Sequence, residues 1–437
     1  MTSTKVDWRK YLRHAALTDI GMRRANNQDA YAVVLAGDVE TWNRRGHLFI
    51  MADGMGGEAA GELASKIAVD HVPHLYHKLA RSSPPEALQT ALQQANAEIH
   101  RRGEANPDFQ RMGTTCVVLA LLPQGALLGH VGDSRAYRLR GTTLEQLTFD
   151  HSLVWEMRAA GQLNDQADVS ITVPKNWITR SLGPKPEVKV DIEGPLPTRT
   201  GDTFLLCSDG LSGQVKDEEI GPILRHLDPE TAAQALIDLA NLRGGPDNIT
   251  VTVVKLTGPE LTSAANNAEP LTVGESLGVK RGAHPAIWGV AGVLALAAGL
   301  LAIVGQEIIA FLAALAFIVA TAIGLLMQFG SFGTKGIELR GGRRLGRGPY
   351  TRTECGENES VARELSSLVR ELLDAVATEP SENAPGARDH ARNGETALKE
   401  ARFDEAVQHF CRAIESLMKA LRGIREKRKA SDSTIEL

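Results

Sequence analysis

The stretch LFIMADGMGG, residues Leu48 to Gly57, is the part of the chain from which both the fold and a candidate site are first read. An apolar run that ends in an acidic residue and is followed by three glycines within four positions is typical of a buried strand that delivers one carboxylate to a sheet edge. Asp53 is that carboxylate. The stretch therefore predicts a functional side chain at the end of a core strand.

The same pattern recurs at three other places in the chain. Apolar runs carry an acidic residue at Leu127 to Ser134, which reads LLGHVGDS, and at Phe204 to Gly210, which reads FLLCSDG. The order is reversed at Asp247 to Val254, DNITVTVV, where the acid precedes the apolar run. Four predicted strands thus each carry an aspartate at one end.

Three of these carboxylates are expected at one edge of a sheet. In an antiparallel sheet the C-terminal end of a strand lies beside the N-terminal end of its neighbour, which would bring together Asp53, Asp209 and Asp247. Carboxylates held this close repel one another unless a divalent cation lies among them. A set of hard oxygen ligands favours magnesium or manganese, so the pattern predicts a metal site.

Composition bounds the class of protein. The 437 residues suffice for two or three globular domains. A net charge of −5 and an aromatic content of 5% favour no nucleic-acid partner. The four cysteines are far apart and form no CxxC pair, which is typical of reduced structural thiols in the cytosol. The first 19 residues contain no apolar stretch, so no cleavable secretory signal is expected.

The first part of the chain has an α+β pattern. Residues 1–256 are predicted to be one domain, in which residues 8–256 alternate strand-like runs with two longer helical patterns. These patterns lie at 59–79 and 85–102, and their apolar residues recur every three or four positions. The polar, poorly periodic segment 150–182 indicates a helical hairpin and a mobile flap. Residues 257–283 are rich in small and polar residues and are predicted to be a linker.

Residues 284–330 are predicted to be a transmembrane helical hairpin. Two uncharged runs, Ala286 to Val304 and Ile308 to Phe329, flank a short turn. Nineteen helical residues span roughly 28 Å, close to the thickness of a bilayer core. Lysine and arginine precede the first run and follow the second, so the positive-inside rule places both ends in the cytoplasm, next to membrane lipid. The alternative is a buried helical hairpin in a soluble domain.

The remaining residues are predicted to be a linker and a small all-α tail. Residues 331–357 are basic, which suits a linker that sets topology and contacts anionic lipid. Residues 358–437 are charged and helical, and within them Ala387 to Met418 resembles one tetratricopeptide repeat. A generic helical hairpin or coiled coil is the alternative. Either helical arrangement suits a tail that binds a protein partner.

Eight motifs in order resemble those of the bacterial PPM-type metal-dependent protein phosphatases, the 2C class. They cover nearly all of residues 8–256. The motifs are DIGMRRANNQD at 19–29, ADGMGG at 52–57, MGTT at 112–115, GDSRAY at 132–137, DHSLV at 150–154, ITRSLG at 178–183, CSDGL at 207–211 and DNIT at 247–250. The resemblance implies a four-layer α-β-β-α sandwich with a metal site at one end of its two sheets.

The resemblance also implies an activity and a ligand set. A phosphatase of this family hydrolyses phosphoserine and phosphothreonine in proteins with water activated by two Mn²⁺ or Mg²⁺ ions. By motif, Asp53 would bridge the two ions and Gly54 would offer its carbonyl oxygen. Asp209 and Asp247 would complete the shell of the first ion, and Asp29 would lie near the second.

Two further roles and two departures follow from the same motifs. Asp133 would help to hold a third, weakly bound ion, and Arg24 would grip the substrate phosphate with its planar guanidinium. Gln28 stands where many family members have Glu, so one contact near the second ion is neutral here. Met55 stands where animal relatives have a His proposed as general acid, so the proton donor is unassigned.

Six polar residues of these motifs have a structural interpretation beside a functional one. Asp19 is expected to brace a turn, Asn248 to orient its neighbours and Asp150 to cap a helix at its N-terminus. Arg180 is expected to be an ion-pair partner, and His130 and His151 are expected to be buried and hydrogen-bonded.

Together these observations favour a membrane-anchored serine/threonine protein phosphatase whose catalytic domain and tail both face the cytoplasm. Its partners would be phosphorylated proteins and a cognate Ser/Thr kinase. The first alternative is a phosphatase-like sensor or scaffold that binds partners without turnover. The second makes the tail the chief functional module, recruiting a substrate or regulator.

Overall fold

The structure of the chain is a computed structural model that describes residues 6–162, 177–263, 268–274, 285–329, 337–339, 343–356, 358–377 and 384–435. The chain divides into two compact units. The first unit comprises Met1–Leu271 and Arg340–Leu437, and the second comprises Thr272–Leu339. The predicted phosphatase domain and the predicted tail therefore belong to the same unit.

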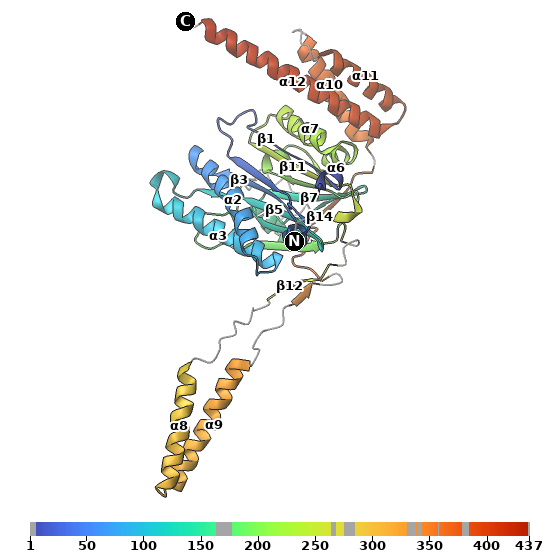
Figure 1. Ribbon diagram of the computed structural model, residues 1–437. Helices are drawn as coiled ribbons and strands as arrows, with labels where there is room; N and C mark the ends of the chain where they lie inside the picture. The colour runs from blue at the N-terminus through green and yellow to red at the C-terminus, as the bar shows by residue number, and fades with distance from the viewer. Residues whose placement is uncertain are drawn as a thin grey trace. The chain divides into compact units, whose positions relative to one another are not determined.

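Two antiparallel sheets form the centre of the first unit (Figure 1). The first sheet has the order β1 (Leu12–Asp19), β11 (Ile249–Leu256), β10 (Thr203–Cys207), β7 (Arg135–Arg140), β8 (Thr143–Gln146) and β14 (Thr351–Glu354). The second has the order β2 (Asp29–Val34), β3 (His47–Met55), β5 (Cys116–Leu122), β6 (Gly125–Val131) and β9 (Asp191–Leu196), with the short β4 (Gly113–Thr114) paired to β3.

Helices cover the outer face of each sheet. Helices α2 (Glu58–Lys78) and α3 (Pro84–Ala105) lie on the second sheet, and α6 (Asp217–His226) and α7 (Pro229–Leu242) lie on the first. The predicted helices at 59–79 and 85–102 correspond to the first two. Short helices complete the unit: η1 (Trp8–Lys10), α1 (Val39–Arg45), η2 (Pro107–Phe109), α5 (Asp209–Ser212) and η4 (Pro259–Leu261). The predicted four-layer α-β-β-α sandwich is confirmed.

Central strands such as β5 and β10 are apolar on both faces because both faces are buried. In β10, Phe204 and Leu206 pack in the core between the two sheets, whereas Leu205 and Cys207 pack against helices α6 and α7. Side chains along a strand point alternately to opposite faces, so a strand between a second sheet and a helical layer needs apolar residues at every position. This requirement explains the uninterrupted apolar runs in the sequence.

The expected single edge for the three aspartates is wrong. Asp53 belongs to β3 of the second sheet, whereas Asp209 follows β10 and Asp247 precedes β11 in the first sheet. Asp53 is also not at the end of its strand, because β3 continues to Met55 by pairing with β4. The carboxylates meet because two sheets face each other, not because neighbouring strands share an edge.

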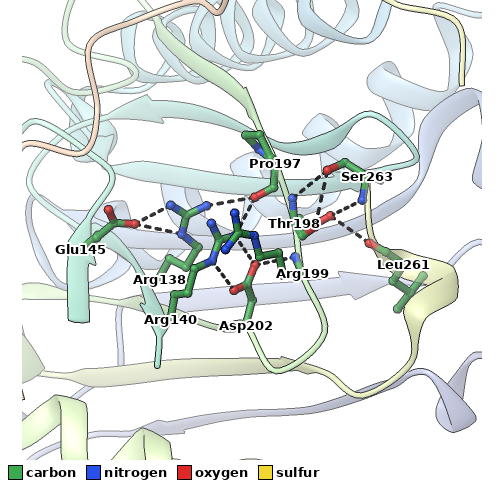
Figure 2. A network of polar contacts seen from close by, with 9 residues as sticks. All are labelled: Arg138, Arg140, Glu145, Pro197, Thr198, Arg199, Asp202, Leu261 and Ser263. Atoms are coloured by element: carbon green, nitrogen blue, oxygen red, sulfur yellow. Dashed lines mark hydrogen bonds and ion pairs between the residues drawn. The ribbon is translucent and has the colours of Figure 1, made fainter. Parts of the chain in front are cut away.

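The predicted linker at 257–283 begins with residues that pack on the sandwich. Thr198 donates from Oγ1 to the carbonyl of Leu261 at 2.9 Å, and the amide of Ser263 donates to the same hydroxyl at 3.1 Å (Figure 2). Leu261 is buried in the core between the sheets. The folded unit therefore extends beyond residue 256, and the rest of the predicted linker includes 264–267 and 275–283, which lie outside the described residues.

The predicted basic linker at 331–357 contains structure that the sequence did not reveal. Strand β14 pairs with β8 and adds an edge to the first sheet. Glu193 of β9 accepts hydrogen bonds from the amide of Gly348 at 3.0 Å and from the hydroxyl of Tyr350 at 2.5 Å. Cys355 is buried against Gly221 of α6. Most of the described part of this segment is therefore fixed to the sandwich.

The tail forms a fifth layer on the sandwich. Its helices are α10 (Glu359–Ala377), α11 (Ala384–Lys399) and α12 (Phe403–Ile435), and α12 packs against α6 and α7. One continuous apolar cluster includes Leu236 of α7, Leu365 of α10 and Phe410 of α12. A single helical pair cannot bury its own apolar face, and here α10 and the outer helices of the sandwich cover it.

The helical hairpin α11–α12 has the close approach expected of small residues. A Cβ atom at Gly394 would lie 2.6 Å from the ring of Phe410, so the glycine allows the ring to pack against the α11 backbone. The antiparallel helices agree with the simpler alternative, a generic helical hairpin. Assignment to the tetratricopeptide class is not supported and stays a prediction.

The second unit contains the apolar hairpin. Helices α8 (Pro285–Ile303) and α9 (Glu307–Phe329) pack side by side, and β12 (Leu271–Val273) pairs with β13 (Ile337–Leu339). In the part of the chain that the structure describes, no helix combines the length and the apolar character needed to cross a membrane. The prediction of two transmembrane helices over 284–330 is therefore not confirmed.

The predicted flap at 150–182 is described only near its two ends. Helix α4 (Leu153–Ala159) follows Asp150, and Ser152 forms a β-bridge with Ile178. Residues 163–176 lie outside the described part of the chain, and the second arm of the predicted helical hairpin falls there.

Gly221 tests how tightly the tail is fitted to the sandwich. A Cβ atom at this position in α6 would lie 2.2 Å from Sγ of Cys355. We expect Gly221→Ala to lower the free energy of unfolding by about 1–3 kcal/mol through overpacking, although alanine favours a helix, as measured by thermal or urea denaturation. Gly386→Ala in α11 is the matched control, because nothing lies within 4 Å of its Cβ position. A Gly221→Ala variant as stable as this control would contradict the close fit.

Candidate metal centre and phosphate pocket

Five aspartates from both sheets meet at one end of the sandwich. Asp29 at the start of β2 pairs in register with Asp53 of β3. Asp209, at the start of α5, and Asp247, two residues before β11, come from the first sheet and line one pocket with Asp133. The pocket has a volume of about 640 Å³. The structure therefore brings together every carboxylate that the motifs had suggested.

Burial, and after it the repulsion between neighbouring charges, raises the pKa of four of these carboxylates. Burial raises the pKa of Asp53 well above its ordinary value, and the charges of Asp29 and Asp209 raise it further. Burial likewise raises the pKa of Asp29 to about 7 and that of Asp133 to about 7, with the charge of Asp209 adding to both. Like charges in a site of low dielectric disfavour ionisation. The cluster is thus poised for a compensating positive charge.

The donor set fits hard divalent cations. Both side-chain oxygens of Asp29 and Oδ1 of Asp133 are buried without a hydrogen-bond partner of normal geometry, although Thr250 and Ser208 lie near enough to lower the pKa of Asp29. Buried carboxylate oxygens without donors are the natural ligands of manganese or magnesium. Among the described residues, no group of three or more His, Cys, Asp or Glu side chains already has the geometry of a complete metal site.

The backbone around Asp53 is held by two threonines of the MGTT motif. The amide of Asp53 donates to Oγ1 of Thr115 at 3.0 Å, and its carbonyl accepts from the amide of Thr115 at 2.9 Å and from Oγ1 of Thr114 at 2.8 Å. Gly54 packs where a Cβ atom would lie 2.2 Å from the carbonyl oxygen of Gly61 in α2. A glycine is therefore required next to Asp53, because a side chain would push α2 away.

Arg24 lies at the mouth of the pocket, next to the carboxylates. Its Nη2 atom is 2.6 Å from Oδ2 of Asp247, and half of its side chain is exposed. The hydrogen bond to Asp247 and the charges of Asp53 and Asp209 raise the pKa of the guanidinium. A permanently charged, partly free guanidinium beside a cluster of carboxylates can bind an anion that the bound cations also attract.

Asn248 joins the loop that carries Arg24 to the segment that carries Asp247. Its Nδ2 donates to the carbonyls of Ile20 at 2.9 Å and Asn26 at 3.0 Å, and its Oδ1 accepts from the amide of Gln28 at 2.8 Å. The prediction that Asn248 orients its neighbours is confirmed. Asp19 braces the same loop through the amide of Gly21 at 2.9 Å, as predicted.

The side chain of Gln28 points toward the start of α2. Its side-chain Nε2 donates to the backbone carbonyl of Gly57 at 3.2 Å, and the backbone carbonyl of Gln28 accepts from the amide of Gly54 at 3.1 Å. A glutamate at this position would present a carboxylate to the Gly57 carbonyl instead of a donor. The departure from the family pattern thus has a structural consequence, a tie between the loop at 20–28 and α2.

The two histidines are structural. His151 is fully buried and contacts Asp191 through Nε2 at 2.9 Å, while its Nδ1 accepts from the amide of Gly132 at 3.0 Å. Burial lowers the pKa of His130 to about 3. Arg180 pairs with Asp191 at 3.1 Å, which confirms the prediction of an ion-pair partner. None of these three side chains is among the described residues that line the pocket.

One structural interpretation is wrong. Asp150 does not cap the flap helix, because Ser152 occupies the N-cap of α4. Asp150 is instead buried and pairs with Arg135, whose Nη2 lies 2.7 Å from Oδ2. The helix N-cap pattern was visible in the sequence, but the distant arginine that competes for the carboxylate was not.

Sequence reasoning did not single out several side chains that line the pocket, four of them large and polar or aromatic. Trp155 and Arg158 come from α4, Gln214 follows α5, and Arg135 begins β7. Arg135 lies in the GDSRAY motif, which gave a signal for it. The other three lie one to four residues beyond a motif, and the sequence alone did not show toward which side of the chain they point.

Two facing sheets between helical layers, with clustered carboxylates and an arginine at one end, define a metal-dependent phosphohydrolase. Comparisons with known proteins identify the family. The sequence model of the protein phosphatase 2C family matches residues 22–240, and the chain belongs to this family. It is a protein-serine/threonine phosphatase that depends on manganese or magnesium.

Relatives and solved structures match the first part of the chain. The chain is 38% identical over 245 residues to the protein phosphatase PhpP of Streptococcus pneumoniae. The aligned region covers 55% of this chain and 96% of that protein. The serine/threonine phosphatase of S. agalactiae superposes with a TM-score of 0.50 at 35% identity, over 56% of this chain and 100% of that one. The catalytic domain of PstP, solved in complex with two manganese ions, is 35% identical over 57% of this chain and 99% of that one, with a TM-score of 0.47.

Metal binding is expected to compete with protons. Because burial and neighbouring charge hold the pKa of Asp29 and Asp133 at about 7, a proton must leave either group before it binds a cation. We expect Mn²⁺ affinity to rise between about pH 6 and pH 8 and to level off above, with proton release that titration calorimetry detects as a heat dependent on the buffer.

Two variants control this measurement. Asp133→Asn cannot bind the proton at that position and should release fewer protons, whereas Asp108→Asn, at an exposed site outside the pocket, should behave as the wild type. An affinity that stays constant over this pH range would show that the carboxylates are ionised before the metal arrives.

Proposed function

We propose that this phosphatase removes phosphate from serine and threonine side chains of cytoplasmic proteins through water activated by two metal ions. The metal ligands in this proposal are Asp29, Asp53, the carbonyl of Gly54, Asp133, Asp209 and Asp247. The observation that carries the proposal is the position of Arg24, a half-exposed guanidinium fixed 2.6 Å from a carboxylate of the cluster.

Bound cations supply an activated water at neutral pH and neutralise charge on the transferring phosphoryl group. The chain itself has three tasks. Arg24 binds and orients the phosphate at the pocket mouth, Thr114 and Thr115 keep Asp53 in place, and the facing sheets hold the carboxylates together against their repulsion. The pocket is open to solvent at Arg24, which suits a phosphorylated segment of a protein better than a small buried metabolite.

The substrate in this proposal is the product of a bacterial Ser/Thr kinase. A phosphatase-like scaffold without turnover is the alternative from a different class. It would predict a missing carboxylate or a blocked pocket, whereas the structure retains all five aspartates and a cavity of about 640 Å³. Turnover therefore explains more of the described site than binding alone.

The membrane location is a separate part of the proposal. Apolar side chains on α8 and α9 point into solvent, including Leu296, which is 71% exposed, and Phe311, which is 69% exposed. No charged residue occurs from Ala286 to Val304. Large exposed apolar surfaces require a covering partner. We propose that this partner is lipid and that the phosphatase unit lies on the cytoplasmic side, near membrane-bound kinases.

Arg24→Ala tests the proposed phosphate binding. We expect kcat/KM on a phosphothreonine peptide with Mn²⁺ to fall about ten- to a hundredfold, because a charge-assisted hydrogen bond to the phosphate is lost. Phosphate release gives the rate. Arg24→Lys should recover only part of the activity, since lysine cannot make two parallel hydrogen bonds.

Asp209→Asn provides the inactive reference for the same assay. If wild-type protein released no more phosphate than this variant at any Mn²⁺ concentration, the catalytic proposal would be abandoned in favour of the scaffold. If Arg24→Ala matched the wild type while Asp209→Asn was inactive, turnover would stand but the role of Arg24 would not.

Cell fractionation tests the membrane proposal. The full chain should remain in the membrane pellet after a high-salt wash and dissolve with detergent. A variant with Leu296→Asp and Leu315→Asp should move to the supernatant, because an acidic residue in the middle of each helix opposes insertion in a bilayer. Recovery of the unchanged chain in the supernatant without detergent would overturn this part of the proposal.

A further inference from the structure

Two side chains of the tail contact the sandwich close to the pocket. Arg422 of α12 lies with Nη2 2.7 Å from Oδ1 of Asp238 in α7 and 3.7 Å from Oδ2 of Asp19 at the end of β1. Glu364 of α10 lies 3.0 Å from Nη2 of Arg243, which follows α7. Both contacts reach the same end of the sandwich as the metal centre.

Asp19 connects Arg422 to the loop that carries Arg24. Its Oδ1 accepts from the amide of Gly21 at 2.9 Å and from Nδ2 of Asn241 at 3.1 Å. Gly21 has a φ of +80°, and a Cβ atom there would lie 2.1 Å from the carbonyl oxygen of Asp247. The turn after β1 thus packs directly against the backbone of Asp247. Because Asp19 is hydrogen-bonded to this turn, a shift of Asp19 also shifts the turn.

The charge arrangement gives Arg422 its role. Asp238 is 1% exposed, burial raises its pKa to about 7, and the charge of nearby Asp19 also raises it, whereas Arg422 lowers it. The guanidinium therefore lies between two carboxylates that would otherwise repel each other. Without it, Asp19 loses its ion pair to α12 and faces the charge of Asp238 uncompensated, so the turn at 20–22 loses one of the contacts that hold it.

The second tail contact reaches the pocket wall. Arg243 donates from Nη1 to the carbonyl of Gln214 at 2.8 Å, and Gln214 lines the pocket. Arg243 also pairs with the buried Glu219 of α6 at 2.5 Å. The tail therefore contacts the end of α7 from two helices, and the segment that leaves α7 leads directly to Asp247.

We propose that Arg422 is a positioning residue: through Asp19 it fixes the turn that leads to Arg24, so that docking of the tail sets the affinity for the phosphorylated substrate. This inference rests on the proposed role of Arg24 in binding phosphate. It makes the tail part of the catalytic unit, and anything that displaces α12 from α7 would weaken substrate binding without touching the pocket.

Steady-state kinetics of the full chain with Mn²⁺ and a phosphothreonine peptide tests the proposal. We expect Arg422→Gln to raise KM about two- to tenfold with kcat changed less than twofold, because the phosphate is held less well while the carboxylates stay in place. Arg422→Lys keeps the charge and should restore KM to within twofold of the wild type. Arg412→Gln, an exposed arginine on the same helix, is the matched control.

A double-mutant cycle separates positioning from simple stabilisation. Asp19→Asn keeps the acceptor for Gly21 but removes the charge, so it should raise KM by a similar factor, and Arg422→Gln should add nothing further in that background. Thermal denaturation of each variant reports stability separately. Asp19→Asn also tests the route without altering the tail, should Arg422→Gln fail to fold.

Three results would overturn the inference. These are a KM for Arg422→Gln equal to that of Arg412→Gln, a loss of stability with unchanged KM, or effects of Arg422→Gln and Asp19→Asn that multiply. If Arg24→Ala lowers kcat/KM while Arg422→Gln does not, phosphate binding by Arg24 stands and only the coupling to the tail fails.

Discussion

Repulsion among buried carboxylates is the constraint on which the catalytic end of this protein depends. Asp29, Asp53, Asp133, Asp209 and Asp247 come from two sheets, and burial and neighbouring charge raise the pKa of the first four. Such a cluster is stable only where hydrogen bonds and packing hold the surrounding backbone in place. Thr114, Thr115 and Asn248 provide that rigidity through hydrogen bonds to the backbone, and they are as much a part of the site as the ligands.

Sequence patterns predicted those parts of the fold that depend on residues close together in the chain. The apolar run before Asp53, the helical periodicity of α2 and α3, and the motif order led to the sandwich and to every carboxylate of the cluster. Long-range pairing was not predictable in the same way. The two-residue strand β4 extends β3 past Asp53, and Arg135 draws Asp150 away from a helix N-cap, because both depend on partners distant in the chain.

The tail shows the same limit more clearly. Its helical periodicity was evident, but a strand of four residues with alternating charge, β14, carried no apolar signal. Its partner β8 supplies the hydrogen bonds, and Gly221 supplies the space for Cys355. A glycine inside α6 made little sense alone, since it weakens a helix, and its reason is visible only with the tail in place.

The pairing of β8 with β14 has a consequence for synthesis of the chain. Glu145 and Arg352, which join these strands, are 207 residues apart. A ribosome must therefore complete α8 and α9 before β14, the edge strand that pairs with β8, exists. Until that moment β8 is an open edge whose backbone groups can pair with another chain. This edge of the sheet that holds the active site is thus completed late, by residues beyond the apolar hairpin, and β8 stays available for wrong pairing until then.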